Sequence, residues 1–150
     1  MLVKKRQNLS SNDVMTMKQG LCFLNEDGEV MTASIFKPLL RTLLPAFADS
    51  AEEIYITYSR VIPGQISARY EKGRKVFALA VKANFSPADV FVRLRIIAGM
   101  SIVAEGHQTG KVVMRFNGHD FDVHVEVTTK ETEEIIHFKC GNQLNHTRNQ

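Results

Sequence analysis

The sequence contains no tryptophan and only two cysteines among its 150 residues. Cys22 and Cys140 lie far apart and form no CxxC pair, which indicates a reducing compartment or simple burial rather than a disulfide scaffold. No apolar run reaches the roughly 18 residues that a membrane-spanning helix needs. The basic residues at 4–6 are not followed by the apolar run of about 7–15 residues that a signal peptide needs. We therefore expect a cytoplasmic protein without a membrane span.

The common motifs of catalysis are also missing. The sequence has no GxxxxGK[ST] loop to hold nucleotide phosphates and no GxGxxG after a strand. HExxH, a zinc-protease motif, and GxSxG, a serine-hydrolase motif, are absent as well. This pattern argues against a self-contained nucleoside triphosphatase, so we expect no catalytic residue, no metal and no cofactor.

The composition is that of an ordinary globular protein. Hydrophobic residues make up 44% and charged residues 23% of the chain, which is enough apolar material for a core. The net charge of +3 is a mild excess, and it does not favour nucleic acid as the partner. The length predicts one domain.

The chain divides into three expected segments. Residues 1–20 form a basic N-terminal segment, in which residues 13–18 fit a short helix. Residues 21–140 form a single α+β domain. Residues 141–150 are polar and lack a period, which predicts a disordered tail.

Hydrophobic periodicity predicts that this α+β domain is an antiparallel sheet with two main helices. Ser34 is a suitable N-cap for the first helix, which reaches Phe47 and which Pro45 should end or kink. Ser86-Pro87 begins the second helix, and Gly99 ends it. The expected strands form one hairpin at 21–24 and 29–32 and one meander at 54–58, 66–70 and 76–81.

Asn117-Gly118 marks the clearest hairpin, between residues 111–116 and 119–127. Both central residues of a type I′ turn need a positive φ, which Asn and Gly adopt readily. A two-residue loop fixes the register, so that Arg115 faces Asp120 and Lys111 faces His124 on the outer side. The core side of this hairpin should carry Val112, Met114, Phe121 and Val123. A polar loop at 128–133 and a last strand at 134–139 should follow.

Four cations are candidates for contact with a phosphate group. They could converge near the glycines at 106 and 110, where a flexible backbone and positive charge can receive an anion. The alternative is an ordinary charged helix face beside a charged sheet face. The four residues are Arg93, Arg95, Lys111 and Arg115.

Two further groups of residues could bind a metal or take part in catalysis, but ordinary structural roles explain them better. Alternation places four polar side chains on one side of the second hairpin strand, where a divalent ion could bind: Asp120, Asp122, His124 and Glu126. Solvation and pairing with Lys111 and Arg115 explain the same pattern. His137 and Cys140 are too few for a zinc site, and a Cys–His catalytic pair remains open.

Residues 93–105, RLRIIAGMSIVAE, resemble the "RIKVMAGMDIAE" signature in the N-terminal domain of type II secretion and type IV pilus assembly ATPases. Residues 108–111, QTGK, look like the "QDGR" that follows it. Residues 118–125, GHDFDVHV, are similar to "GxxxDVRVS". The resemblance extends over residues 35–139 in the same order. Residues 51–57 stand at the place of "GASDIHIE", with Tyr55 and Thr57 instead of its His and Glu.

This resemblance implies a small PAS-like α+β domain that packs against other subunits and couples their movements. The family's motor domain, with its P-loop, has no counterpart in the chain. Lys111 and His124 stand where the family has arginines, and arginines of this domain help to clamp nucleotide. The resemblance therefore implies contact between proteins rather than ATPase activity.

Two functions follow as hypotheses. The first is a non-catalytic interaction or regulatory module of a bacterial secretion, type IV pilus or conjugation machine. Its partners would be the assembly ATPase or the inner-membrane platform protein, with a homo-oligomer as a further option, and partners could hold it at the inner membrane. The second is a nucleotide- or nucleic-acid-binding module that uses the four cations for phosphate contacts.

Overall fold

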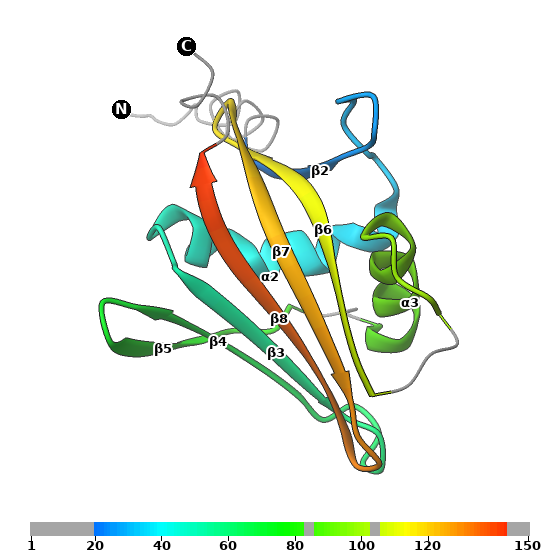
Figure 1. Cartoon of the computed structure of the whole chain (residues 1–150). Helices are drawn as coiled ribbons and strands as arrows, with labels where there is room; N and C mark the ends of the chain where they lie inside the picture. Colours follow the sequence, from blue (N-terminus) through cyan, green and yellow to red (C-terminus); the bar gives the residue numbers. More distant parts are fainter. Residues whose placement is uncertain (1–19, 83–85, 103–105, 144–150) are drawn as a thin grey trace, which may run out of the picture.

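The computed structural model of the chain describes residues 20–82, 86–102 and 106–143. Seven antiparallel strands form one sheet in the order β2-β6-β7-β8-β3-β4-β5 (Figure 1). The bounds of the strands are Leu21–Leu24 (β2), Glu53–Ser59 (β3), Ile66–Lys72 (β4), Lys75–Leu79 (β5), Gly106–Phe116 (β6), His119–Thr129 (β7) and Glu133–Gln143 (β8).

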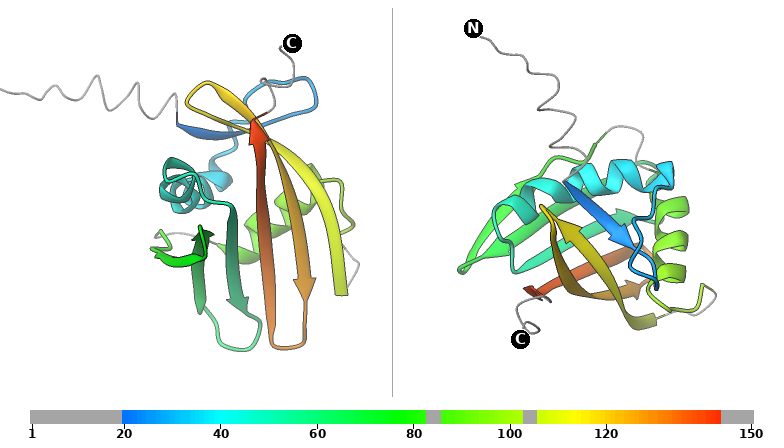
Figure 2. Two further views of the ribbon diagram at one scale, coloured as in Figure 1. Left: turned by 60° about the vertical axis from the view of Figure 1, so that its left-hand side comes forward. Right: turned by 90° about the horizontal axis from the view of Figure 1, so that it is seen from above.

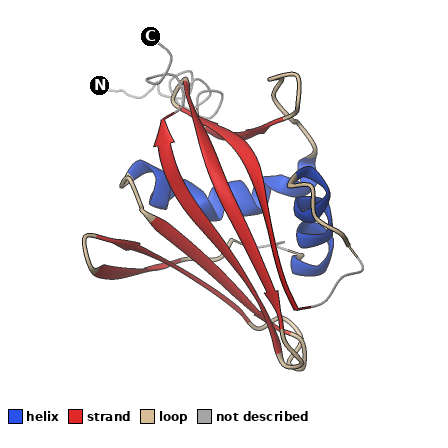
Figure 3. Ribbon diagram, viewed as in Figure 1, coloured by secondary structure: helices blue, strands red, loops and turns tan. Residues whose placement is uncertain are grey.

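Two α-helices in the described part of the chain, α2 (Lys37–Ala48) and α3 (Pro87–Ile97), lie on one side of the curved sheet (Figure 2). Figure 3 shows the helices against the strands in contrasting colours. A single core cluster joins the apolar faces of both helices to one face of the sheet. We call this the inner face of the sheet and the opposite face the outer face. The predicted α+β class, an antiparallel sheet with two main helices, is confirmed.

The β6–β7 hairpin has the predicted turn and register. Asn117 and Gly118 have φ values of 53° and 81°, as a type I′ turn requires. Phe116 pairs with His119, and Arg115 pairs with Asp120. Val112, Met114 and Val123 are buried on the inner face, and Phe121 is half-buried beside them. The hairpin is longer than predicted, because both strands continue to Gly106 and Thr129.

The predicted hairpin between residues 21–24 and 29–32 forms only in part. The Leu24–Val30 bridge and the hydrogen bond from Met31 N–H to the Phe23 carbonyl join the two runs, but residues 29–32 form no strand, and β2 pairs along its length with the end of β6. Pairing with β6 lets Phe23 bury its ring completely, at 5.0 Å from the ring of Phe36. The local turn survives, because Asn25 Oδ1 accepts hydrogen bonds from the backbone N–H groups of Asp27 and Glu29 at 2.8 and 2.9 Å.

The first helix reaches the predicted Phe47 and differs from the prediction in its start and in the effect of Pro45. A 3₁₀ turn, Ser34–Phe36, precedes α2, so Phe36 rather than Ser34 is the N-cap residue. Pro45 does not end the helix, which continues to Ala48. The extra turn buries Ala46 and Phe47 in the core, and this burial outweighs the hydrogen bond that proline cannot donate.

Strand boundaries account for the other differences. The residues around Gly106 and Gly110 form the start of β6, and the polar loop predicted at 128–133 is shortened to residues 130–132, because 128–129 belong to β7 and Glu133 begins β8. The third strand of the meander, β5, begins and ends earlier than predicted. The predicted tail begins too early, because residues 141–143 continue β8, where Gln143 pairs with Phe121. The predicted helix at 13–18 and residues 144–150 lie outside the described residues.

Replacing Ser50 with glycine is expected to raise the free energy of unfolding by about 1 kcal/mol. Ser50 follows the C-cap of α2 with a φ of 60°, and its N–H bonds the carbonyl of Phe47, as in a Schellman motif. Glycine adopts this conformation without the steric cost that serine carries. Urea unfolding would measure the gain. Ser67→Gly, in the extended strand β4, should lower stability instead, and a gain there would contradict the explanation.

Candidate functional site

The four predicted phosphate-contact residues are not brought to one site. Arg93 is exposed on α3. Arg95, on the same helix, is only 7% exposed. Lys111 and Arg115 stand on the outer face of β6, four positions apart along the strand. The structure thus separates one buried arginine from three surface cations on two elements.

Arg95 forms a buried ion pair with Glu134. Its Nη2 donates to Glu134 Oε2 and lies 3.4 Å from Thr129 Oγ1, which itself donates to the same carboxylate oxygen at 2.9 Å. Glu134 is also only 7% exposed. Arg95 Nε is buried without a hydrogen-bond partner among the described residues. The guanidinium therefore ties α3 to the ends of β7 and β8 and does not face a ligand at the surface.

Lys111 and Arg115 each have an acidic partner on β7. Lys111 Nζ lies 3.3 Å from Asp122 Oδ2, so its ion pair runs diagonally and not to His124, its partner in register. Arg115 donates to both carboxylate oxygens of Asp120, at 2.7 and 3.3 Å. Pairing offsets much of the positive charge that a phosphate would need.

A close junction joins the end of α3 to β6. Gly99, with a φ of 78°, ends the helix, and the carbonyl of Ala98 accepts a hydrogen bond from the backbone N–H of Lys111 at 3.3 Å. A Cβ on Gly110 would lie 2.3 Å from the oxygen of Ala98, which is closer than any real contact. Only glycine at position 110 lets the helix end approach the strand in this way.

A row of side chains in direct register crosses the outer face. Arg69 on β4, Tyr55 on β3 and His137 on β8 are neighbours in the pairing. The rings of Tyr55 and His137 stack at 4.2 Å, and the guanidinium of Arg69 lies 4.2 Å from the centre of the Tyr55 ring. Both faces of Tyr55 are therefore covered, and its ring is not free to stack on a nucleic-acid base.

Two carboxylates complete this outer-face network. His137 Nε2 lies 2.6 Å from Glu53 Oε1, and His137 Nδ1 lies 3.6 Å from Glu126 Oε1. Tyr55 donates to Glu53 at 3.0 Å. Burial and this hydrogen bond raise the pKa of Tyr55 to about 12, so the phenol stays protonated and is a poor general base at neutral pH. Lys139 bonds the second Glu126 oxygen at 3.1 Å.

Stability should fall in acid because of this network. The hydrogen bond from Lys139 lowers the pKa of Glu126 below its ordinary 4.5. Burial raises the pKa of Glu53, but bonds from Tyr55 and His137 outweigh burial and lower it overall. Both carboxyl groups are thus harder to protonate in the folded chain. Their stabilisation is complete above about pH 4.5 and is lost as the pH falls through the lower folded values.

Glu126→Gln should therefore reduce the drop in melting temperature between neutral pH and pH 3, measured by circular dichroism. Glu131→Gln is the matched control, because Glu131 is exposed and has no ion pair within the described structure. Equal pH dependence in the wild type and Glu126→Gln would contradict this assignment.

The candidate metal ligands on β7 and the candidate Cys–His pair do not form a reactive site. Among the described residues, no three His, Cys, Asp or Glu side chains are placed to hold a metal ion. His137 lies on the outer face and Cys140 on the inner face, so they do not meet as a catalytic pair. Burial raises the pKa of Cys140 to about 12, which keeps its thiol protonated and weakly nucleophilic.

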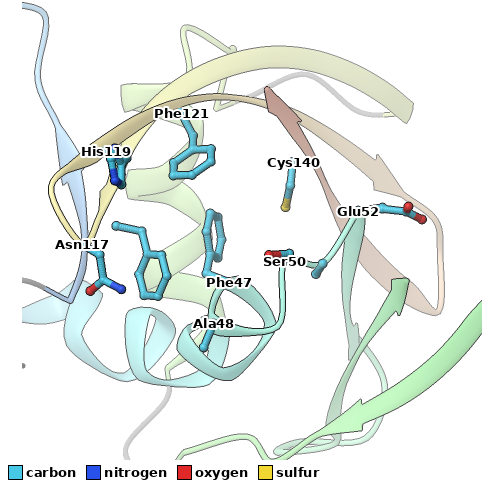
Figure 4. A pocket seen from close by; sticks show the side chains of 10 residues that line it. Phe47, Ala48, Ser50, Glu52, Asn117, His119, Phe121 and Cys140 are labelled. Atoms are coloured by element: carbon cyan, nitrogen blue, oxygen red, sulfur yellow. The ribbon is translucent and has the colours of Figure 1, made fainter. Parts of the chain in front are cut away.

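A pocket of about 350 Å³ lies between the end of α2, the β6–β7 turn and β8 (Figure 4). Three aromatic rings form its apolar wall: Phe47, Phe116 and Phe121. The Phe47 ring is 6.2 Å from each of the other two. Figure 4 shows the sulfur of Cys140 pointing toward Ser50 on the opposite side. The size is near the lower limit for small-molecule sites, and the aromatic wall suits a small apolar group.

No described helix is long and apolar enough to cross a membrane. The chain was also compared with known proteins. No protein-family model matches it, and no curated protein matches it.

Proposed function

We propose that this chain is a non-catalytic interaction module of a bacterial secretion, type IV pilus or conjugation machine. It would have the PAS-like architecture of the N-terminal domain of type II secretion and type IV pilus assembly ATPases. Its place would be the cytoplasm, at the inner membrane where its partners are. Those partners would be the assembly ATPase or the inner-membrane platform protein.

The junction between α3 and β6 carries this proposal. The resemblance depends most on residues 93–99, RLRIIAG, and on residues 108–111, QTGK. These stretches are separate in sequence, yet Ala98 and Gly110 lie in direct backbone contact, and Lys111 bonds the Ala98 carbonyl. The same close backbone contact therefore explains why both Ala98 and Gly110 are small. This is expected if the two stretches form one motif.

The surface of α3 suits contact with another protein. Val92 and Ile96 are one turn apart, exposed by 39% and 56%, and Arg93 stands beside them. Side chains at this spacing share a helix face, and exposed apolar groups next to a cation are typical of protein interfaces. A phosphate-binding role has less support, because Arg95 is buried and two other cations are paired with acids.

Co-purification tests the proposal directly. The tagged chain, produced in its own host, should retain the assembly ATPase or the platform protein. Ile96→Lys should abolish this retention, because a buried unpaired charge is costly at an interface. Ile62→Lys is the matched control, since Ile62 is 51% exposed in the β3–β4 turn. Failure to retain either protein from a host with an intact machine would overturn the proposal.

A further inference from the structure

The two edge strands of the sheet, β2 and β5, differ in whether another segment covers them. At one end, β2 has its outer edge covered by the following segment: Met31 N–H bonds the carbonyl of Phe23 at 2.9 Å, and Val30 bridges to Leu24. At the other end, β5 forms the outer edge of the β4–β5 hairpin (Figure 1). No described segment pairs with its outer side. One edge is closed within the chain, and the other is open.

The register shows which backbone groups point outward from β5. Lys72 and Lys75 flank the two-residue turn and exchange hydrogen bonds across it. Alternation then directs the N–H and C=O groups of Phe77 and Leu79 toward β4. The N–H and C=O groups of Val76 and Ala78 point to the open edge. No hydrogen bond to these backbone groups occurs within the described structure.

β5 lacks the features that protect edge strands from pairing. Such strands usually carry an inward charge, a proline or a bulge. Residues 76–79, VFAL, are four consecutive apolar residues, and the pairing with β4 has no register shift. Val76 is 60% exposed. The nearest preceding cations, Lys72, Arg74 and Lys75, are at the turn, so the middle of the strand carries no charge.

We propose that β5 pairs antiparallel with β5 of a second copy of this chain, which joins two seven-stranded sheets into one. Val76 of each copy would face Ala78 of the other and exchange two hydrogen bonds with it. Phe77 would face Phe77 on the two-fold axis, and Lys75 would face Leu79. This interface is self-complementary, because apolar residues meet and no like charges stand opposite each other.

The pairing does not depend on the proposed role in a secretion machine. A five-residue strand buries less area than the roughly 1,200–2,000 Å² of a stable interface. The dimer should therefore be weak and dependent on concentration.

Sedimentation equilibrium over a wide range of concentration tests the pairing on the whole chain. The wild type should pass from monomer to dimer. Val76→Lys should raise the dissociation constant at least about tenfold, since about 1.4 kcal/mol of lost binding has this effect. Val61→Lys is the matched control: Val61 is 62% exposed in the β3–β4 turn, and its replacement should leave the dimer intact.

Hydrogen exchange, followed by NMR, gives a second and more specific signature. In the concentrated wild type the amides of Val76 and Ala78 should gain protection, while the amide of Phe77, already bonded to β4, should not. Ala78→Pro removes one outward N–H group without removing a hydrogen bond to β4, and it should also dissociate the dimer. Unchanged unfolding by urea would show that each variant is folded.

Three results would overturn the proposal. The first is a wild type that stays monomeric at every concentration. The second is a dimer that survives both Val76→Lys and Ala78→Pro in their folded forms. The third is a monomer whose Val76 and Ala78 amides become protected only when the assembly ATPase is added, which would assign the edge to that protein.

Discussion

Replacing Arg95 with methionine is expected to lower the free energy of unfolding by about 3–5 kcal/mol. Methionine fills a similar length of the apolar space beneath α3, so the loss would come mainly from charge. Glu134 would remain buried, with only the Thr129 hydroxyl to bond it among its present partners. An isolated buried carboxylate is costly because no water replaces the missing cation. Urea unfolding followed by circular dichroism measures this loss.

The double variant Arg95→Met with Glu134→Leu separates charge from packing. It should regain most of the stability, because apolar groups replace both members of the buried pair. Arg95 Nε, which has no partner among the described residues, would no longer need one. Arg93→Met is the surface control and should change stability by less than about 0.5 kcal/mol. Equal losses in the Arg95 single and double variants would show that the ion pair is not the reason.

Gly110→Ala is expected to cost about 2–3 kcal/mol, although alanine is usually favoured over glycine in a strand. The new Cβ would lie 2.3 Å from the Ala98 oxygen, and both atoms belong to backbone-fixed positions. Either the end of α3 moves away or the Lys111–Ala98 hydrogen bond stretches. Thermal unfolding gives the loss, and the chemical shift of the Lys111 amide reports on the hydrogen bond.

Gly106→Ala is the control for this variant. A Cβ on Gly106 would meet no described residue within 4 Å, and its positive φ of 86° opposes the change. The cost there should be about 1–2 kcal/mol, with no change at the Lys111 amide. If the two variants behaved alike at that amide, steric contact with Ala98 would not explain the effect of Gly110→Ala. The variant also tests the junction on which the proposed function depends.

Local signals in the sequence predicted the parts of the fold that local chemistry determines. Asn117-Gly118 determined both the turn and the register of the β6–β7 hairpin, because a two-residue type I′ loop permits a single alignment. Ser86-Pro87 and Gly99 delimited α3 for similar reasons. The hairpin after β2 was predicted too long, because a turn signal reports only local geometry. The choice of β6 as the partner of β2 depends on residues some ninety positions away.

The side-chain contacts of the candidate site were less predictable than the fold. The sequence does, however, contain a signal for the buried positions of Arg95 and Glu134. Arg95 follows Phe91 by four positions, which places it on the apolar face of α3. Glu134 alternates with Ile136 and so shares the core side of β8. Together these positions indicate a buried ion pair rather than a phosphate contact. The stacking of Tyr55 on His137 has no such signal, since the pairing of β3 with β8 is not local.

The strand order also has a consequence for how the chain folds. β3 pairs with β8, and Glu53 and His137, which meet there, are 84 residues apart. Loops of this length slow closure, which predicts folding in milliseconds to seconds. At a synthesis rate of about 5–20 residues per second, roughly 4–17 s separate the two residues on a ribosome. During that interval the apolar side of β3 has no completed core to cover it, so newly made chains should depend on chaperones.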